Sequence, residues 1–349
     1  MKNWKQLVIG LGIAAGALYY TLRNVSVDDL VASLKTVQYI YLIPMLVVIV
    51  VNYVARIYRW RALISPMKNV ELWGLGAPMM VGFLGNILPG RVGEFLRPYL
   101  LAKKFDLSFS GSLATVVVER IFDIIILLVL FVWAFVFHAE VFNSQAAFSG
   151  VSVQTIAVKF GQASGLLVGA LMVFIYFLAF HQEKAMGWVR WFIKPLPHKW
   201  HDKIEYLFEE FALGLTVVKD LSALLRVTFW SVIVWVAIVY SYYPLYLAYN
   251  LENQSLQSLV ILTVIVCIFI TVLPTPAFLG SMNAGVLVAL HEIMGESEVA
   301  AVSFGFAAWA ANFIVIFMAG LYFILHEHLS VKQLVEAGEK GQEAVEKHE

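Results

Sequence analysis

The sequence predicts an all-α polytopic membrane protein with about six to eight transmembrane helices, and three observations predict this class. The chain of 349 residues is 61% hydrophobic and 14% charged, and its mean hydropathy is +0.80. Apolar stretches long enough to cross a bilayer recur along the chain. Two of these stretches are broken at their middle by proline and glycine. A soluble domain needs more surface charge, so the apolar excess is expected to face lipid.

Six apolar stretches are predicted to be full spans, because a bilayer core of roughly 30 Å needs about 20 helical residues. They are residues 7–22, 39–60, 113–137, 165–180, 224–249 and 299–325. The first is short and follows Lys2 and Lys5, as a signal peptide would. No small-residue cleavage site follows it, so it is predicted to be a retained anchor.

The positions of Lys and Arg predict the orientation of these spans. Basic residues cluster at 2–5, 56–68, 91–104 and 184–226, and in the tail from residue 332. We therefore expect both termini on the cytoplasmic side, and the loops 137–161 and 250–255 outside. The segment 182–221 has an amphipathic pattern and is predicted to lie at the cytoplasmic interface.

The two broken stretches, residues 72–101 and 256–290, are predicted to enter and leave the membrane on the same side. If the first crossed once, Lys103 and Lys104 would lie outside, against the charge rule. Six spans with two re-entrant hairpins are therefore preferred to eight spans. The domain prediction is one transmembrane domain over residues 1–329 and a charged cytoplasmic tail over 330–349.

The broken stretches also predict an inverted repeat. Their breaks lie at residues 86–94 and 271–280, at corresponding places in the units 39–137 and 224–325, which have opposite predicted senses. Paired broken helices of this kind indicate a transporter site. Their free N–H groups and positive dipole ends suit anions. The alternative is that Pro and Gly only kink ordinary spans.

Six charged residues lie in or after the first break, at spacings that place them on common helix faces. They are Arg91, Glu94, Arg97, Glu119, Arg120 and Asp123. Charges at membrane depth cost about 2.5–3.5 kcal/mol each, so they are expected to face inward and pair. In one interpretation the arginines bind an anionic head group, and the acids orient them or couple the step. In the other, a salt-bridge cluster holds the hairpin against the next span.

The remaining substrate-binding candidates are polar or small residues near the two breaks. They are Asn86, Gly90, Gly280, Asn283, Trp309 and Asn312. Gly90 and Gly280 are expected to lie at the ends of the broken helices. Trp309 and Asn312 are three residues apart in an apolar span and are predicted to line one cavity, or alternatively to pack helix against helix.

Charge balance and cysteine content limit the remaining function classes. The chain has 24 basic and 24 acidic residues, so no nucleic-acid partner is expected. A single cysteine, Cys267, leaves no intrachain disulfide, and no cofactor or metal is predicted. His198, His201 and Asp202 are interpreted as an exposed interfacial cluster rather than metal ligands. No phosphate-binding loop or nucleophile elbow occurs, so an enzyme is not predicted.

The motif Leu-Pro-Gly-Arg-x-Gly-Glu at 88–94, with Glu119-Arg120-x-x-Asp123, resembles the flippase-like family named for the transmembrane region of lysylphosphatidylglycerol synthase. Arg59-Trp60 and Leu273-Pro274 fit the same pattern, over residues 5–327. The resemblance implies a multi-pass protein of the bacterial or archaeal inner membrane, with two re-entrant elements, that moves lipids between leaflets. A stand-alone member without the synthase domain is expected, because the chain ends soon after its last span.

The second break departs from the family pattern, which usually reads Pro-Gly-Gly-x-Gly with a following Glu. Here residues 276–280 read Pro-Ala-Phe-Leu-Gly, without the glycine pair or the acid. This departure implies a different substrate or a less polar second site.

The leading hypothesis is a flippase or scramblase that moves an anionic phospholipid or lipid-linked head group between leaflets. Membrane lipids are the expected partners, together with a possible lipid-synthesising enzyme in trans. Two alternatives remain open: a membrane-embedded transferase acting on a lipid-linked substrate, and a non-transporting partner subunit that recruits an enzyme through residues 182–221.

Overall fold

A computed structural model describes residues 4–87, 92–137, 147–148, 151–152, 181–194 and 219–329, with parts of 159–180 and residues 201 and 205. The predicted tail 330–349, Gly90 and Arg91 lie outside the described residues, as do much of the predicted span 165–180 and of the segment 182–221. Apart from turns and loops, the described part is helical except for β1 (Ala147–Phe148) and β2 (Val151–Ser152), which pair antiparallel. The predicted all-α membrane class is confirmed.

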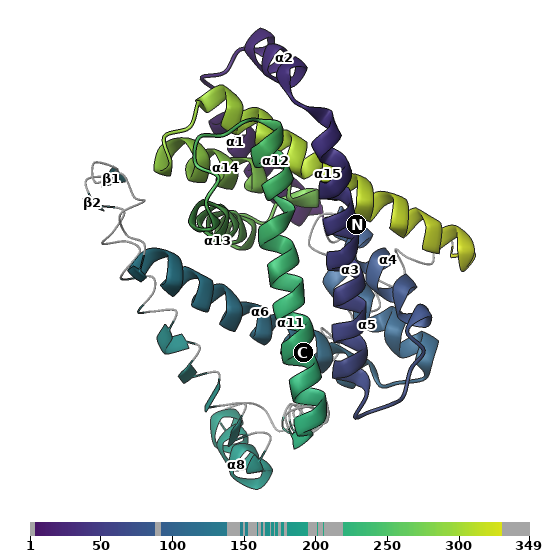
Figure 1. Cartoon of the computed structure of the whole chain (residues 1–349). Coiled ribbons are helices and arrows are strands. Elements are labelled where there is room, and N and C mark those ends of the chain that lie inside the picture. Colours follow the sequence, from purple (N-terminus) through teal and green to yellow (C-terminus); the bar gives the residue numbers. More distant parts are fainter. Residues whose placement is uncertain are drawn as a thin grey trace.

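Long helices make up most of the fold (Figure 1). They are α1 (Trp4–Leu22), α3 (Leu42–Ile64), α6 (Phe109–Phe137), α11 (Leu221–Ser241) and α15 (Glu298–His326). By length and composition, the stretches Tyr39–Ile64, Leu221–Ala248 and Glu298–His326 can each cross a membrane. A fourth crossing is possible if α1 and α2 (Val27–Thr36), which meet at 76°, count as one bent span. Helix α6 has 29 residues, and at 1.5 Å per residue it is about 44 Å long.

The first broken stretch folds as a helical hairpin of α4 (Gly76–Gly85) and α5 (Val92–Phe105). The two helices are only about 15 and 21 Å long, so neither spans a bilayer core alone. Glycines allow the backbones of α4 and α5 to approach each other closely. A Cβ on Gly82 would lie 2.7 Å from Arg97 Cβ, and one on Gly93 would lie 2.0 Å from the Gly82 oxygen. The hairpin agrees with the sequence, while its entry from the cytoplasmic side stays a prediction.

The second broken stretch is also a hairpin, made of α13 (Leu256–Val272) and α14 (Ser281–Leu287). A single turn, η5 (Pro276–Phe278), lies between them, and the π-helical η6 (Val288–Ile293) extends α14. Gly285 permits the close contact, because a Cβ there would lie 2.9 Å from Val266 Cα. Both broken stretches therefore turn back on themselves.

The two predicted repeat units pack reciprocally. Helices α3 and α11 lie side by side and antiparallel, since Asn52 bonds the Val234 carbonyl and the Tyr58 ring stacks on Trp230. Hairpin helix α4 packs on α15, the last long helix of the other unit, and α13 packs on α6. Two units related by a twofold axis would pack in this way, and the inverted repeat itself stays a prediction.

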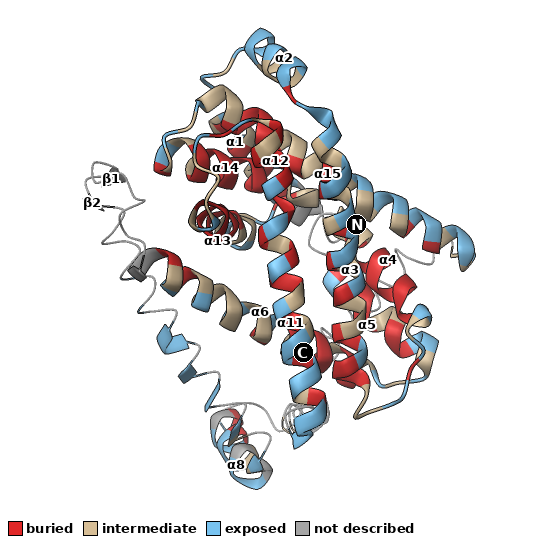
Figure 2. Ribbon diagram, viewed as in Figure 1, coloured by how far each residue is buried: buried red, intermediate tan, exposed pale blue. Residues whose placement is uncertain are grey.

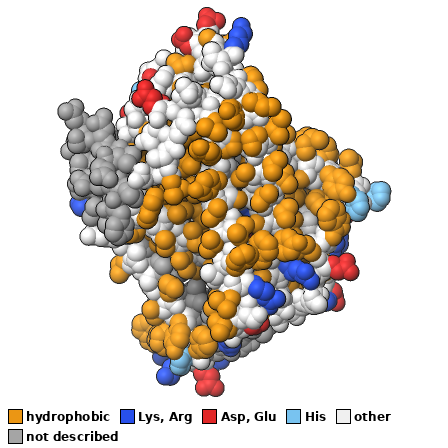
Figure 3. Space-filling view, viewed as in Figure 1, with side chains coloured by type: hydrophobic (Ala, Val, Ile, Leu, Met, Phe, Trp, Pro, Cys, Tyr) orange, Lys and Arg blue, Asp and Glu red, His pale blue; other side chains and the backbone are white. Residues whose placement is uncertain are grey.

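Two large buried apolar clusters and a small third one, of Ala55, Val234 and Trp235, form the described interior (Figure 2). One large cluster lies among α13, α14, α15 and the short α12 (Tyr243–Ala248), and the other lies around α4, α5 and the end of α3. Outward-facing positions on α3, α11 and α15 are apolar as well, among them Val47, Val50, Val54, Phe229, Val232, Val236, Ile314, Phe317 and Met318. Hydrophobic side chains cover much of the face in Figure 3. Such a continuous apolar surface is suited to lipid contact.

The amphipathic helix α8 (Gln182–Ile193) is the described part of the predicted interfacial segment. Trp188 and Trp191 are exposed on it, while Val189 and Ile193 are buried. Its Arg190 pairs with Glu205 at 2.7 Å. Exposed tryptophans beside charged residues agree with a position at the membrane surface.

Candidate functional site

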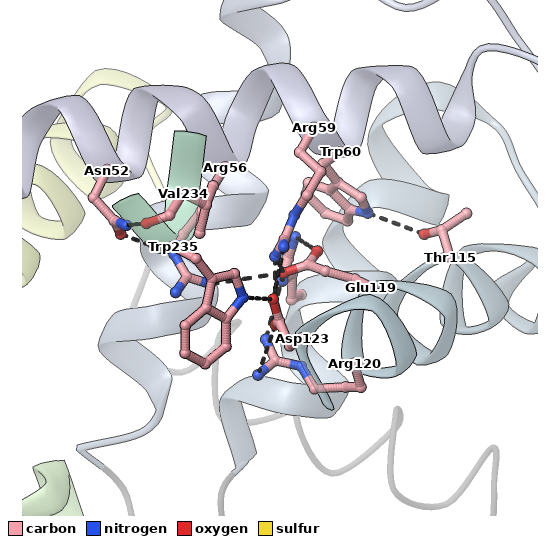
Figure 4. A network of polar contacts seen from close by, with 11 residues as sticks. Asn52, Arg56, Arg59, Trp60, Thr115, Glu119, Arg120, Asp123, Val234 and Trp235 are labelled. Carbon is pink, nitrogen blue, oxygen red and sulfur yellow. Dashed lines mark hydrogen bonds and ion pairs between the residues drawn. The ribbon is translucent and has the colours of Figure 1, made fainter. Parts of the chain in front are cut away.

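A cluster of charged side chains lies where α3, α5, α6 and α11 meet (Figure 4). We call it the arginine cluster and define it as Arg56, Arg59, Arg97, Glu119, Arg120 and Asp123. The acids and Arg120 come from one turn of α6, Arg56 and Arg59 from α3, and Arg97 from the first hairpin. Four arginines thus face two carboxylates inside an apolar helical protein.

Glu119 is the centre of the cluster. Its side chain is fully buried and accepts hydrogen bonds from two arginines on different helices. Arg59 Nη2 lies 2.7 Å from Oε1, and Arg97 Nη2 lies 2.6 Å from Oε2. Arg97 also donates from Nη1 to Oε1 at 3.1 Å, which completes a bidentate pair. Charge-assisted pairs of this geometry are the strong ones, so Glu119 ties α5 and α3 to α6.

Asp123 extends the cluster to α11, which belongs to the second predicted repeat unit. Arg59 Nη1 donates to its Oδ1 at 2.7 Å, and the Trp235 indole of α11 donates to the same oxygen at 3.1 Å. Arg59 therefore pairs with both acids, and its own side chain is fully buried. Burial of this guanidinium is tolerated because both carboxylates neutralise it.

The Arg97 guanidinium is enclosed on its remaining side. It lies over the Trp60 ring, 4.1 Å from the centroid, and Phe83 is 5.7 Å away. The Trp60 indole in turn donates to Thr115 Oγ1 at 3.0 Å. Stacking on an aromatic face suits a guanidinium in a dry site.

Arg120 differs from Arg59 and Arg97 because its side chain is 47% exposed. Its contacts with the acids are longer, at 3.4 Å to Glu119 Oε1 and 3.7 Å to Asp123 Oδ2. Arg56 is also held loosely, 3.9 Å from Glu119, and its Nε donates to Asn52 Oδ1 at 2.9 Å. Both acids are already well paired through Arg59 and Arg97, so Arg120 retains donors for an external anion.

A cavity of about 150 Å³ opens beside the cluster, and we call it the polar cavity. Its wall comes from the first hairpin, from α6 and from the end of α13 with the turn that follows it. Four predicted site residues line it, namely Asn86, Glu94, Arg97 and Arg120. Phe83, Thr271 and Phe278 form part of the rest. The structure thus brings residues of both broken stretches to one space.

A smaller cavity of about 30 Å³ adjoins the polar cavity and shares Asn86, Phe83 and Phe278 with it. The predicted pair Trp309 and Asn312 lines this smaller cavity. The Trp309 indole donates to the Ala277 carbonyl at 3.0 Å, and Asn312 donates to Ala308 in its own helix. These two residues face the same space, as their spacing predicted.

Gly280 and Asn283 line neither of these two cavities, and their place in a binding site stays a prediction. Gly280 packs on α1, where a Cβ would lie 2.9 Å from the Ala14 oxygen, and its φ is +90°. Asn283 is fully buried, and its Oδ1 accepts a hydrogen bond from the Gly280 N–H at 3.0 Å. Both residues stabilise the start of α14. The predicted residues Gly90 and Arg91 lie outside the described part of the chain.

Several members of the site are not among the residues that the sequence predicts to form it. Arg56 belongs to a basic cluster that predicts orientation, Arg59 belongs to the family motif, and Asn52 and Trp235 match no motif. Asn52, Arg56 and Arg59 recur at spacings of four and three on one face of an apolar helix, which is a signal for inward-facing polar groups. Nothing in the sequence around Trp235 distinguishes it from the other aromatic residues of its span.

The described residues hold no group of three or more His, Cys, Asp or Glu side chains placed to bind a metal ion. The site presents arginines, carboxylates and amides. These groups can hold an anion and a hydrogen-bond donor side by side.

The fold and the site together define a polytopic helical membrane protein with a buried arginine–carboxylate cluster beside a polar cavity. Residues 7–320 match the family described as the lysylphosphatidylglycerol synthase TM region. The chain belongs to this family, which confirms the resemblance drawn from its motifs and relates it to lipid handling. The comparisons with curated proteins and with solved structures gave no match.

Proposed function

We propose that this protein moves a phospholipid between the leaflets of its membrane by accepting the phosphate in the polar cavity. The observation that carries the proposal is Arg120, half-exposed at the wall of that cavity and only loosely held by acids that other arginines already pair. A phosphate would accept two parallel hydrogen bonds from such a guanidinium.

The other cluster members have supporting roles in this proposal. Arg59 and Arg97 saturate Glu119, and the excess of arginines keeps the cavity wall positive. The hairpins supply backbone breaks at membrane depth, which are tolerated where they line a cavity. The acyl chains would remain in the bilayer, along the exposed apolar faces of the long helices.

The test is lipid translocation in proteoliposomes, with fluorescent lipids that carry the label on an acyl chain and a reductant that quenches only the outer leaflet. Arg120→Ala is expected to slow translocation at least about tenfold, because a charge-assisted hydrogen bond worth about 1.5–3 kcal/mol is lost. Arg226→Ala is the matched control, since Arg226 is an exposed arginine that bonds only its own helix in the described structure.

Both variants should elute and melt as the unchanged protein does, because neither guanidinium is a buried partner of the cluster. A folded Arg120→Ala protein that transports at the full rate would refute the assigned role of Arg120. If the folded, unchanged protein moves no phospholipid at all, the transport proposal fails, and the transferase and partner-subunit alternatives return.

A further inference from the structure

We propose that a groove between α3 and α15 binds one acyl chain of a membrane phospholipid, whose phosphate lies beside Lys35. We call this site the lipid groove. It is separate from the polar cavity, because its α15 residues lie on a different face of that helix from Trp309 and Asn312, which line the smaller cavity. A lipid can occupy the groove without being transported, so this inference does not rest on the proposed function.

The lining of the lipid groove is hydrocarbon. The groove lies where α2 and the start of α3 meet α15 (Figure 1). Leu42 and Leu46, one turn apart, line it from α3, together with Leu34 of α2 and Tyr39 of the short helix η1 (Tyr39–Tyr41). The α15 wall consists of neighbours on one helix face, and its alanines leave room for a ligand: Phe306, Ala307, Ala310, Ala311 and Ile314. Apart from the Tyr39 hydroxyl, no lining side chain carries a polar atom.

The groove opens on the apolar surface that the long helices expose. Helices α3 and α15 belong to stretches that can each cross a membrane. Ile314 in the groove wall is exposed, and so are Val47, which follows Leu46, and Met318, one turn after Ile314. In a bilayer such a surface is covered by acyl chains, since no water reaches the hydrocarbon core. A lipid chain is therefore the occupant that the surroundings of the groove supply.

The dimensions of the groove fit one acyl chain. Its volume is about 330 Å³, roughly twice the ~150 Å³ of a cavity that takes up benzene. The wall from Phe306 to Ile314 is about 12 Å long, and one leaflet occupies about half of a hydrocarbon core of roughly 30 Å. A helix of a second copy, 10–12 Å across, would fill about 900 Å³ or more over this length, so it is too thick to enter.

The end of the groove at Tyr39 has the character of a membrane–water boundary. Tyr39 begins the candidate span Tyr39–Ile64, its ring is exposed, and its hydroxyl donates to the Leu34 carbonyl at 2.7 Å. Lys35 follows Leu34, is exposed, and forms no ion pair with a described residue. The acids of α2, Asp28 and Asp29, lie about 9 Å or more away along the helix. A phosphate at this end would therefore pair with Lys35.

The experiment titrates a photoreactive phospholipid into the purified protein in detergent micelles. The lipid has a glycerol head group and a diazirine in the middle of one acyl chain, and mass spectrometry locates the inserted label. We expect labelling at residues 42–46 and 306–314 to saturate at about one lipid per protein, because a bound chain occupies a single site. Labelling of the exposed α11 face, at Phe229, Val232 and Val236, should only rise in proportion to the lipid added.

A filled groove tests the walls. Ala310→Phe should lower the labelling of residues 42–46 at least about fivefold, because the added ring occupies the place of the chain. Val236→Phe on the exposed face of α11 is the matched control and should leave this labelling unchanged. If Ala310→Phe fails to fold, the titration of the unchanged protein still decides whether the groove is a site.

Competition tests the phosphate end. Unlabelled phospholipid should displace the label at about fivefold lower concentration than a diacylglycerol with the same chains, since one lysine near the head group contributes a factor of this order. In Lys35→Ala the two competitors should act equally. Lys103→Ala is the matched control, because Lys103 is an exposed lysine of α5, and it should preserve the difference.

Three results would overturn the proposal. Labelling that rises in proportion at the groove as it does on α11 would show a lipid-facing surface without a site. A groove that takes no label in the folded protein, with a changed oligomeric state in Ala310→Phe, would mean that a second copy covers it. Diacylglycerol that competes as well as phospholipid in the unchanged protein would remove the phosphate from Lys35.

Discussion

The two hairpins occupy corresponding places in the two predicted repeat units, yet different forces hold them. The first is fixed to its surroundings by charge, through the bidentate pair of Arg97 with Glu119. The second is fixed by close backbone fit and neutral hydrogen bonds. Gly280 lies against α1, Thr275 and Ser281 hydroxyls meet at 2.8 Å, and the Trp309 indole bonds the Ala277 carbonyl.

This difference indicates which half carries the chemistry. Buried charge is expensive and a neutral contact would hold a hairpin as well, so a charged anchor suggests use of the charge. The second hairpin instead stores backbone strain, since Ala277 and Phe278 have φ values of 51° and 60°. Its turn supplies Phe278 as a shared wall of both cavities. We infer that the first hairpin holds the ligand and the second shapes its enclosure.

The largest expected effect on stability comes from removing the centre of the charged anchor. Glu119→Ala leaves Arg97 without its buried carboxylate and Arg59 with Asp123 alone. Breaking a buried pair in this way costs about 3–5 kcal/mol of unfolding free energy. Thermal unfolding in detergent micelles measures the loss of stability. If the loss is very large, little folded protein will be recovered.

The exposed pair of Arg190 and Glu205 provides the control for this prediction. The Arg190 side chain is 61% exposed, so Glu205→Ala should change the unfolding temperature little. If Glu119→Ala is as stable as Glu205→Ala, the charged anchor is not what holds the first hairpin, and the comparison of the two hairpins fails.

A smaller loss is expected when the close fit of the second hairpin is disturbed. Gly280→Ala places a methyl group 2.9 Å from the Ala14 oxygen at a φ of +90°, and about 1–3 kcal/mol should be lost. Gly295→Ala is the matched control, because Gly295 also has a positive φ but no atom lies within 4 Å of its added Cβ. Equal losses in the two variants would show that backbone conformation alone, and not contact with α1, matters at Gly280.

The last comparison concerns two single indole hydrogen bonds, one beside each hairpin, and the smallest expected effect is that of the Trp309 bond. Trp235→Phe removes a donor to the charged Asp123 and should cost about 1.5–3 kcal/mol, whereas Trp309→Phe removes a donor to a neutral carbonyl and should cost about 0.5–1.5 kcal/mol. Unfolding of both proteins under the same conditions measures the difference. A reversed order would mean that charge is not the stronger fixing force.

Much of the site was predictable from local spacing. Glu119 and Asp123 are one helical turn apart in an apolar span, so their inward orientation followed from helix geometry and from the cost of exposing charge to lipid. The same reasoning placed Arg97 near them. It assigned Arg97 and Arg120 the same role, however, whereas one is enclosed between Glu119 and Trp60 and the other is half-exposed.

Arg59 shows most clearly why the rest was not predictable. It lies near the end of a predicted span, where Lys and Arg ordinarily mark the cytoplasmic side. Its partners Glu119 and Asp123 are 60 and 64 residues away in sequence, and Trp235 reaches Asp123 across 112 residues. No local pattern encodes such pairings, because they depend on which faces of separate helices meet.

The sequence alone determined that this protein belongs in a membrane and that its buried charges must pair, and it favoured two stretches that turn back over two additional spans. These properties follow from the length and hydrophobic period of the apolar segments and from the cost of exposing charged residues to hydrocarbon. All of these are properties of the local sequence. The tertiary structure decided that Arg59 and Arg97 saturate Glu119, that Arg120 remains available at the cavity, and that Gly280 and Asn283 serve the fold. Those outcomes depend on how α3, α5, α6 and α11 are packed together, and the packing is set by shape across the whole chain.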